Sequence, residues 1–206
     1  MGSRRRLSGI RKNNVNISQQ HIDEAVQILR QGGVVVFPTE TAYGLAADAR
    51  NEEAVQKVAV LKGRPEEKSF PILAASREMV EAVAGIPRGL ERLASKHWPG
   101  PLTLVLPEMG ELASGVVRGG TVAVRVTSHP VAKALSEGLG SPIVSTSANR
   151  SGEEVCYSVA CVRGQINEGP DFYLDGGELE PELPSTIVAV DDYGYPEVLR
   201  QGSIEI

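Results

Sequence analysis

The chain has 206 residues, of which 41% are hydrophobic and 23% are charged, and this usage excludes fibrous and intrinsically disordered classes. The length suits a single domain. Lys and Arg together number 21 against 26 Asp and Glu, and the resulting net charge of −5 argues against a wholly basic nucleic-acid binder.

In the first half of the chain, segments with helical periodicity alternate with apolar runs typical of strands, which indicates a layered α/β fold. Residues 1–16 are expected to be a basic tail, and residues 17–206 the folded domain. Ser18 and Asn51 are typical helix-capping residues. The elements predicted in this half are a helix over 21–30, a strand over 34–37, a helix over 52–61, a strand over 70–75, and helices over 77–83 and 88–97.

The second half continues the same alternation. Pro130 suits the first position of a helix because its fixed φ is already helical. The predicted elements are strands over 102–106 and 121–126, a helix over 130–137, a strand over 142–144, a helix over 159–166, and strands over 172–174, 186–190 and 197–199. We therefore predict a single α/β domain with a twisted, open, mixed sheet and flanking helices.

Several common chemistries are excluded by what the sequence lacks. No apolar run approaches the roughly 20 residues that span a bilayer, so no membrane association is expected. The three histidines are not at metal-ligand spacing, and neither a G-x-x-x-x-G-K-[ST] nor a G-x-G-x-x-G loop occurs. Cys156 and Cys161 are too few for a disulfide framework, which favours a reducing cytoplasm.

Four polar clusters follow apolar elements, where ligands of open α/β sheets collect. They are residues 38–44; Lys62, Arg64 and Lys68; residues 145–152; and a dispersed set of Thr121, Arg125, Ser185, Thr186 and Arg200. The hydroxyls could form hydrogen bonds with a small polar ligand, and the cations could bind a phosphate. Each cluster also has a purely structural interpretation. In the same order, these are threonines that hydrogen-bond their own backbone, cations that interact with a helix C-terminus, an ordinary polar loop, and an arginine on the surface.

Taken together, these clusters resemble a known family. The segments that carry the resemblance, in family order, are 37–45 (FPTETAYGL), 62–65 (KGRP), 98–103 (WPGPLT), 124–126 (VRV), 145–149 (STSAN), 184–188 (PSTIV) and 199–202 (LRQG). The chain is similar to the YrdC family, the threonylcarbamoyl-AMP synthases, over residues 17–202. It resembles the short, single-domain form of that family, in which a concave basic surface binds the ligands.

The resemblance implies a reaction that joins L-threonine, bicarbonate or CO2, and ATP, and releases pyrophosphate. The product, threonylcarbamoyl-AMP, supplies the threonylcarbamoyl-adenosine modification at tRNA position 37. The resemblance also implies Mg²⁺ bound with ATP, no metal held by the protein itself, an indirect link to tRNA through the transferase machinery, and a cytoplasmic location.

Residue roles also follow from the resemblance. The residues expected to hold L-threonine are Thr41, Arg125, Ser145 and Ser185. Those expected to contact ATP are Arg64, Lys68, Thr121, Ser147, Val155 and Arg200. The tetrad expected to lie closest to the reacting phosphate is Lys62, Arg64, Ser147 and Asn149.

The main alternative is a non-catalytic RNA-binding module that uses the same concave surface, which the arginines of the amino-terminal segment would favour. The net charge argues against it, because non-specific RNA affinity rests on neutralising phosphates. RNA binding also has no need of a serine and an asparagine in the order that the tetrad shows.

Overall fold

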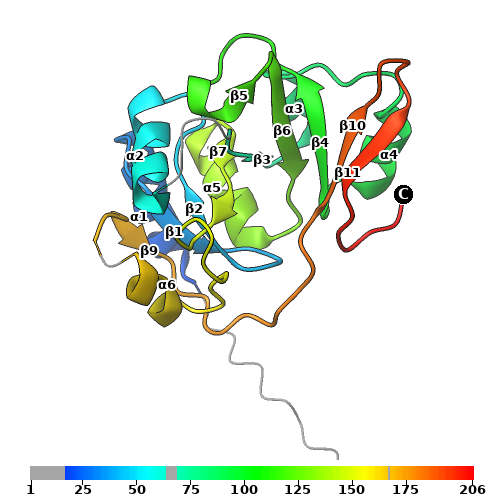
Figure 1. Ribbon diagram of the computed structural model, residues 1–206. Coiled ribbons are helices and arrows are strands. Elements are labelled where there is room, and N and C mark those ends of the chain that lie inside the picture. Colours follow the sequence, from blue (N-terminus) through cyan, green and yellow to red (C-terminus); the bar gives the residue numbers. More distant parts are fainter. Residues whose placement is uncertain (1–16, 64–68, 167) are drawn as a thin grey trace, which may run out of the picture.

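The computed structural model describes residues 17–63, 69–166 and 168–206 (Figure 1). The helices are α1 (Gln19–Arg30), α2 (Glu52–Lys62), α3 (Arg77–Glu81), α4 (Glu91–His97), the 3₁₀ helix η1 (Ser114–Val116), α5 (Pro130–Leu139) and α6 (Val159–Gln165). The strands are β1 (Val35–Pro38), β2 (Tyr43–Ala46), β3 (Ile72–Ala74), β4 (Leu102–Pro107), β5 (Val117–Arg118), β6 (Thr121–Val126), β7 (Ile143–Val144), β8 (Thr146–Ser147), β9 (Phe172–Tyr173), β10 (Thr186–Val190) and β11 (Pro196–Arg200). The basic tail expected at residues 1–16 lies outside the described residues.

The strands divide between two mixed sheets. The smaller sheet has the order β8-β2-β1-β9, and the larger has β11-β10-β4-β6-β3-β7 with β5 paired to β6. Parallel pairs (β1 with β9, β4 with β10, β3 with β6) stand beside antiparallel ones. The predicted mixed α/β fold is confirmed, and the structure differs from the prediction in having two sheets in place of one.

One short segment belongs to both sheets. β7 pairs with β3 in the larger sheet, and β8, two residues later, pairs with β2 in the smaller sheet. Ser145 lies between them, and its backbone N–H donates to the carbonyl of Pro71 (2.9 Å). The polar loop singled out in the sequence is therefore the point where the chain crosses from one sheet to the other.

The main apolar core extends under both sheets. It includes Val36 and Leu45 from the smaller sheet and Ile72, Leu102 and Leu104 from the larger, all essentially buried. A second cluster packs α1 and α5 against β1, with Val26 and Leu135 among its members. Each buried aliphatic side chain contributes about 1.5–3 kcal/mol of transfer free energy, so the shared core ties the two sheets into one unit.

The helices begin where their caps predict. The side chain of Ser18 accepts from the backbone N–H of His21 (3.3 Å), and that of Asn51 accepts from Ala54 (3.0 Å). α1 and α5 approach closely because Gly138 has no side chain: a Cβ there would lie 2.7 Å from Cγ2 of Val26. The strands that the sequence did not predict are β2, β5 and β8.

Candidate functional site

A cavity of about 580 Å³ opens between the two sheets. The smaller sheet lines it with the β1–β2 turn, β2 and β8, and the larger sheet lines it with residues of β4, β6, β10 and β11. The crossing residue Ser145 lies on its wall. The cavity therefore forms where strands from distant parts of the sequence meet.

Most of the residues predicted from the sequence surround this cavity. Those that line it are Thr41, Arg125, Ser145, Ser147, Val155, Ser185 and Arg200. Lys62 and Asn149 are buried and are joined to Ser147 by hydrogen bonds. Arg64 and Lys68 lie outside the described residues.

Thr121 is at the start of β6, on the strand face that also carries Ala123 and Arg125. Ala123 and Arg125 line the cavity, whereas the hydroxyl of Thr121 donates to the carbonyl of Arg118 (2.8 Å) in the turn between β5 and β6. A contact between Thr121 and ATP stays a prediction.

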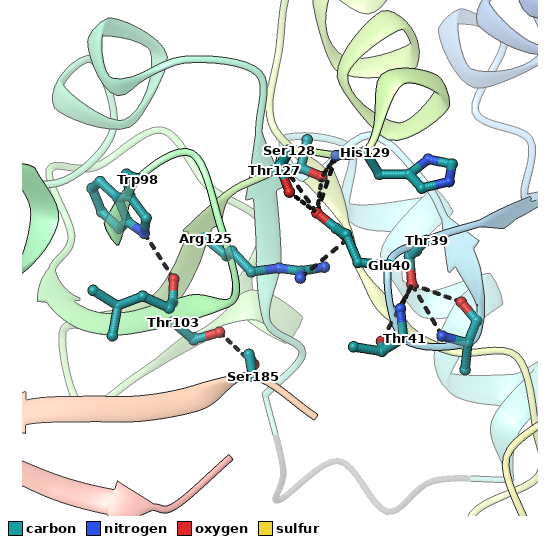
Figure 2. Close-up of polar contacts among 12 residues, drawn as sticks. Thr39, Glu40, Thr41, Trp98, Thr103, Arg125, Thr127, Ser128, His129 and Ser185 are labelled. Atoms are coloured by element: carbon teal, nitrogen blue, oxygen red, sulfur yellow. Dashed lines mark hydrogen bonds and ion pairs between the residues drawn. The ribbon is translucent and has the colours of Figure 1, made fainter. Parts of the chain in front are cut away.

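Arg125 presents a buried guanidinium to the cavity and faces one carboxylate (Figure 2). Its Nη1 is 3.2 Å from Oε2 of Glu40, and the side chains of the two residues are only 9% and 20% exposed. Burial by itself raises the pKa of Glu40, but the charge of Arg125 and hydrogen bonds to the carboxylate outweigh it and lower the pKa to about 2. Glu40 is therefore ionised at neutral pH.

The β1–β2 turn holds two threonines, Thr39, which is buried, and Thr41, which is half-buried. The hydroxyl of Thr39 donates to the carbonyl of Ala42 (2.6 Å) and accepts from the backbone N–H of Thr41 (3.2 Å). Thr39 thus fulfils the structural interpretation, a side chain that closes its own turn. Thr41 lies on the cavity wall, so its hydroxyl is placed to meet a ligand.

The opposite wall is built from β4, β10 and β11. The hydroxyls of Thr103 and Ser185 are 2.9 Å apart, and Arg200 donates through Nη2 to the carbonyl (2.8 Å) and hydroxyl (3.2 Å) of Ser185. Burial and, to a lesser extent, the positive charge of Arg125 lower the pKa of Arg200. Two guanidiniums that share one cavity repel each other, so an anionic ligand between them is favoured.

Hydrogen bonds from Lys62 hold the loop that follows β7 in place. Its Nζ donates to the backbone carbonyls of Ser147 (2.5 Å) and Asn149 (2.9 Å) and to Oδ1 of Asn149 (3.3 Å). The hydroxyl of Ser147 donates to the same Oδ1, and Nδ2 of Asn149 donates to the carbonyl of Glu153 (2.7 Å). The three described members of the predicted tetrad therefore form one network, with Ser147 on the cavity side.

A disulfide joins Cys156 to Cys161 beside the cavity. Val155 and Tyr157, the two neighbours of Cys156, both line the cavity, and the carbonyl of Cys156 accepts from the backbone N–H of Tyr43 (2.9 Å). Two cysteines are too few for a disulfide framework, but they form this local bond, which argues against the use of the cysteine count as a sign of a reducing compartment. It fixes the loop that precedes α6.

Some residues that line the cavity or contact Arg125 were not predicted from the sequence. Thr103, Tyr157 and Glu182 line the cavity, and Glu40 lies behind Arg125. The signal for Thr103 was available, since it ends a recognised motif and its hydroxyl follows the apolar start of a strand. Glu40 stands inside the first polar cluster, but its partners are 85 or more positions away.

Among the residues that the structure describes, no group of three or more His, Cys, Asp or Glu side chains is placed to hold a metal ion. No helix in the same residues is long and apolar enough to cross a membrane.

Comparisons with known proteins agree on one family. The Sua5/YciO/YrdC family model, described as telomere recombination, matches residues 27–202. The threonylcarbamoyl-AMP synthase of Pyrococcus abyssi (strain GE5 / Orsay) is 39% identical over 193 residues, which are 92% of this chain and 56% of that protein. The threonylcarbamoyl-AMP synthase of Halorhodospira halophila (strain DSM 244 / SL1) is 44% identical over 168 residues, which are 79% of this chain and 87% of that protein.

A solved structure is similar as well. The crystal structure of P. abyssi Sua5 complexed with L-threonine superposes with a TM-score of 0.82 and 39% sequence identity, covering 88% of this chain and 54% of the other. The chain thus spans about half the length of the Pyrococcus proteins and most of the length of the Halorhodospira relative.

Proposed function

Since the chain belongs to the Sua5/YciO/YrdC family, we propose that it is an L-threonylcarbamoyladenylate synthase, a nucleotidyltransferase that makes threonylcarbamoyl-AMP and pyrophosphate from L-threonine, bicarbonate or CO2, and ATP. One observation carries the proposal. A buried guanidinium, Arg125, shares a single cavity with the hydroxyls of Thr41, Ser145 and Ser185. A carboxylate suits the guanidinium, and hydroxyls suit the polar side chain and carbamate of such a substrate.

The reaction needs positioning and charge neutralisation more than covalent help. The threonine amine adds to CO2 and loses a proton, which gives a carbamate. A carbamate oxygen then bonds to the α-phosphorus of ATP while the bond between that phosphorus and the bridging oxygen breaks, and pyrophosphate leaves. Holding the two substrates in line supplies much of the rate enhancement expected of such a transfer.

We assign the phosphates to Arg200 and Ser147, which line the cavity from the larger and the smaller sheet respectively. Arg64 and Lys68, which were also predicted to contact ATP, lie outside the described residues. Lys62 holds the loop of Ser147 through three hydrogen bonds, which suits a role in shaping the phosphate subsite. Mg²⁺ enters as part of the MgATP substrate, held largely by phosphate oxygens and water.

The product places this activity before a transfer to tRNA. We propose that this activity supplies the threonylcarbamoyl group for adenosine 37 of tRNA. The transferase machinery, and not this cavity, would contact the tRNA. A cytoplasmic location belongs to the same proposal, because the product serves tRNA modification.

The RNA-binding alternative is less well supported. Arg125 is 8% exposed and lies inside a cavity of about 580 Å³, which suits a small ligand better than a polymer backbone. RNA affinity would rest on accessible cations along a surface.

The test is pyrophosphate release from MgATP and bicarbonate, with and without L-threonine, with the nucleotide product identified by mass. We expect threonine-dependent release and the mass of threonylcarbamoyl-AMP. Arg125→Ala removes the partner of the carboxylate and should lower kcat/KM for L-threonine by about a hundredfold or more. Arg118→Ala, at an exposed arginine that ends β5 and does not line the cavity, is the matched control and should behave as the wild type.

Two results would contradict the proposal. Pyrophosphate release that does not depend on L-threonine, from protein shown to be folded, would reject this substrate. Tight RNA binding that Arg125→Ala abolishes, without synthase activity in the wild type, would favour the RNA-binding module.

A further inference from the structure

The carboxylate of Glu40 reaches from the β1–β2 turn of the smaller sheet to the larger sheet (Figure 2). Its Oε1 accepts four hydrogen bonds from the three residues that follow β6. The donors are Oγ1 of Thr127 (2.8 Å), the backbone N–H (3.0 Å) and hydroxyl (3.2 Å) of Ser128, and the backbone N–H of His129 (3.1 Å). The turn is thereby fastened to the end of the strand that carries Arg125.

The second carboxylate oxygen serves Arg125 in a different way. Oε2 of Glu40 is 3.2 Å from Nη1 of Arg125, yet both atoms are buried without a hydrogen-bond partner among the described residues. The contact is therefore an attraction between charges and not a directed hydrogen bond. Nη1 of Arg125 is itself covered by the protein, so Glu40 meets the guanidinium on its buried side.

A buried guanidinium needs a counter-charge when the cavity holds no anion. Glu40 supplies that counter-charge. Among the described residues, Arg125 and Thr41 line the cavity and Glu40 does not, so Glu40 contacts Arg125 from the side away from the cavity. Thr41 follows Glu40 directly in the same turn, so one side chain restrains two members of the predicted threonine site. Arg200 and Ser147, by contrast, are held by other partners.

We propose that Glu40 is a positioning residue for the amino-acid end of the cavity: it orients Arg125 and the Thr41 turn so that a substrate carboxylate meets a guanidinium already in place. The inference rests on the proposed function. It predicts that Glu40 governs the recognition of the carboxylate and leaves the recognition of the nucleotide nearly unchanged.

The test compares ligands that differ only in the carboxylate. Calorimetry would give the Kd of L-threonine, of L-threoninol (an alcohol in place of the carboxylate) and of MgATP for the wild type and for Glu40→Gln. Glutamine keeps an oxygen that can accept the four hydrogen bonds but removes the charge. We expect the preference for L-threonine over L-threoninol to fall about tenfold, with the Kd of MgATP within about twofold of the wild type.

The matched control is Glu111→Gln. Glu111 also pairs with an arginine, Arg50 (3.1 Å), but this pair is exposed and does not line the cavity. Its ligand affinities should equal those of the wild type. If Glu40→Gln does not fold, Thr127→Val removes one of the four hydrogen bonds and keeps both charges, and we expect a fall of about threefold in the same preference.

Three outcomes would overturn the inference. An unchanged preference in folded Glu40→Gln, or in folded Thr127→Val where the first variant does not fold, would show that the ligand does not sense Glu40. A parallel loss of L-threonine and MgATP affinity would indicate a general structural role. A wild type that binds no L-threonine would reject the proposed function itself, and this inference with it.

Discussion

Two arginines enter the cavity from different strands and are restrained in different ways. Arg200 donates to the carbonyl and hydroxyl of Ser185, so part of its hydrogen-bonding capacity is already used by the protein. Arg125 is held by the charge of Glu40, and its Nη1 has no hydrogen-bond partner among the described residues. The difference suits a site in which Arg125 receives a ligand oxygen and Arg200 contributes charge to the opposite wall.

The pair of Glu40 and Arg125 predicts a specific acid sensitivity. The pKa of Glu40 falls from 4.5 to about 2 on folding, so its stabilisation is complete well above pH 4.5 and is lost as the pH falls towards 2. At pH 3 the loss should reach about 2 kcal/mol of unfolding free energy. Urea unfolding at pH 7 and pH 3 should show this extra loss in the wild type and not in Glu40→Gln.

His129 is the other titratable group beside this pair, and burial lowers its pKa. The charge of Glu40 partly offsets this effect, so Glu40→Gln should lower the pKa of His129 further, and a measurement of that pKa in both proteins separates its contribution from that of Glu40. Equal losses of stability in the wild type and Glu40→Gln would contradict the assignment of the acid sensitivity to Glu40.

Residue predictions succeeded where the signal was local and failed where it was not. Strand alternation correctly placed Thr121 and Arg125 on one face, because side chains alternate along a strand whatever its neighbours are. It left open whether that face is inward, and the structure shows Arg125 buried. Glu40 carried no such signal. Its role depends on Arg125 and on residues 127–129, which are far along the chain and become its neighbours only when the two sheets meet.

At the scale of elements, the helices were easier to predict than the strands. Ser18, Asn51 and Ser76 begin their helices because each cap is satisfied within three residues. β2 and β8 were not predicted because they are short and pair with each other, Gly44 opposite Ser147. Such pairing depends on long-range contacts, and the polar residues 39–41 before β2 made the whole segment resemble a turn.

The disulfide predicts a redox effect that is confined to one element. Cys156 and Cys161 close a short loop, and the chain-entropy estimate for such a loop is about 2 kcal/mol. Reduction should lower the unfolding free energy by up to that amount. It should also weaken MgATP binding several-fold, because Val155 and Tyr157 flank Cys156 and line the cavity.

Urea unfolding and MgATP titration, each with and without a thiol reductant, would measure both effects. The double variant Cys156→Ala/Cys161→Ala is the control, and it should not respond to the reductant. A wild type with the same stability and the same Kd in both conditions would show that the bond does not restrain the loop.

At the scale of the whole molecule, the site belongs to neither sheet alone. Thr41 and Ser147 come from the smaller sheet, and Arg125, Ser185 and Arg200 come from the larger sheet or its edges. The sequence predicted one sheet because strand patterns do not say which strands pair. A net charge of −5 likewise did not indicate a cavity with two guanidiniums, because composition averages over the surface.

The shared core predicts that both sheets unfold together and that a ligand stabilises both. Val36 and Leu45 of the smaller sheet and Leu102 of the larger belong to one buried cluster. Trp98, the only tryptophan, packs against this cluster on the larger-sheet side, and its Nε1 donates to the carbonyl of Leu102 (2.7 Å). Its fluorescence therefore reports the larger sheet, while far-UV circular dichroism reports all elements.

We expect the two signals to give one coincident urea transition, and L-threonine at a hundred times its Kd to raise the unfolding free energy from both by about 2.7 kcal/mol. The physical reason is that a ligand held by Thr41 and Arg125 binds only when both sheets are folded. If L-threonine shifted the circular dichroism transition but left the Trp98 transition in place, the two sheets would unfold independently and the ligand would bind to the smaller one alone. Arg125→Ala distinguishes these cases, because it should abolish the shift in both signals if the site spans the two sheets.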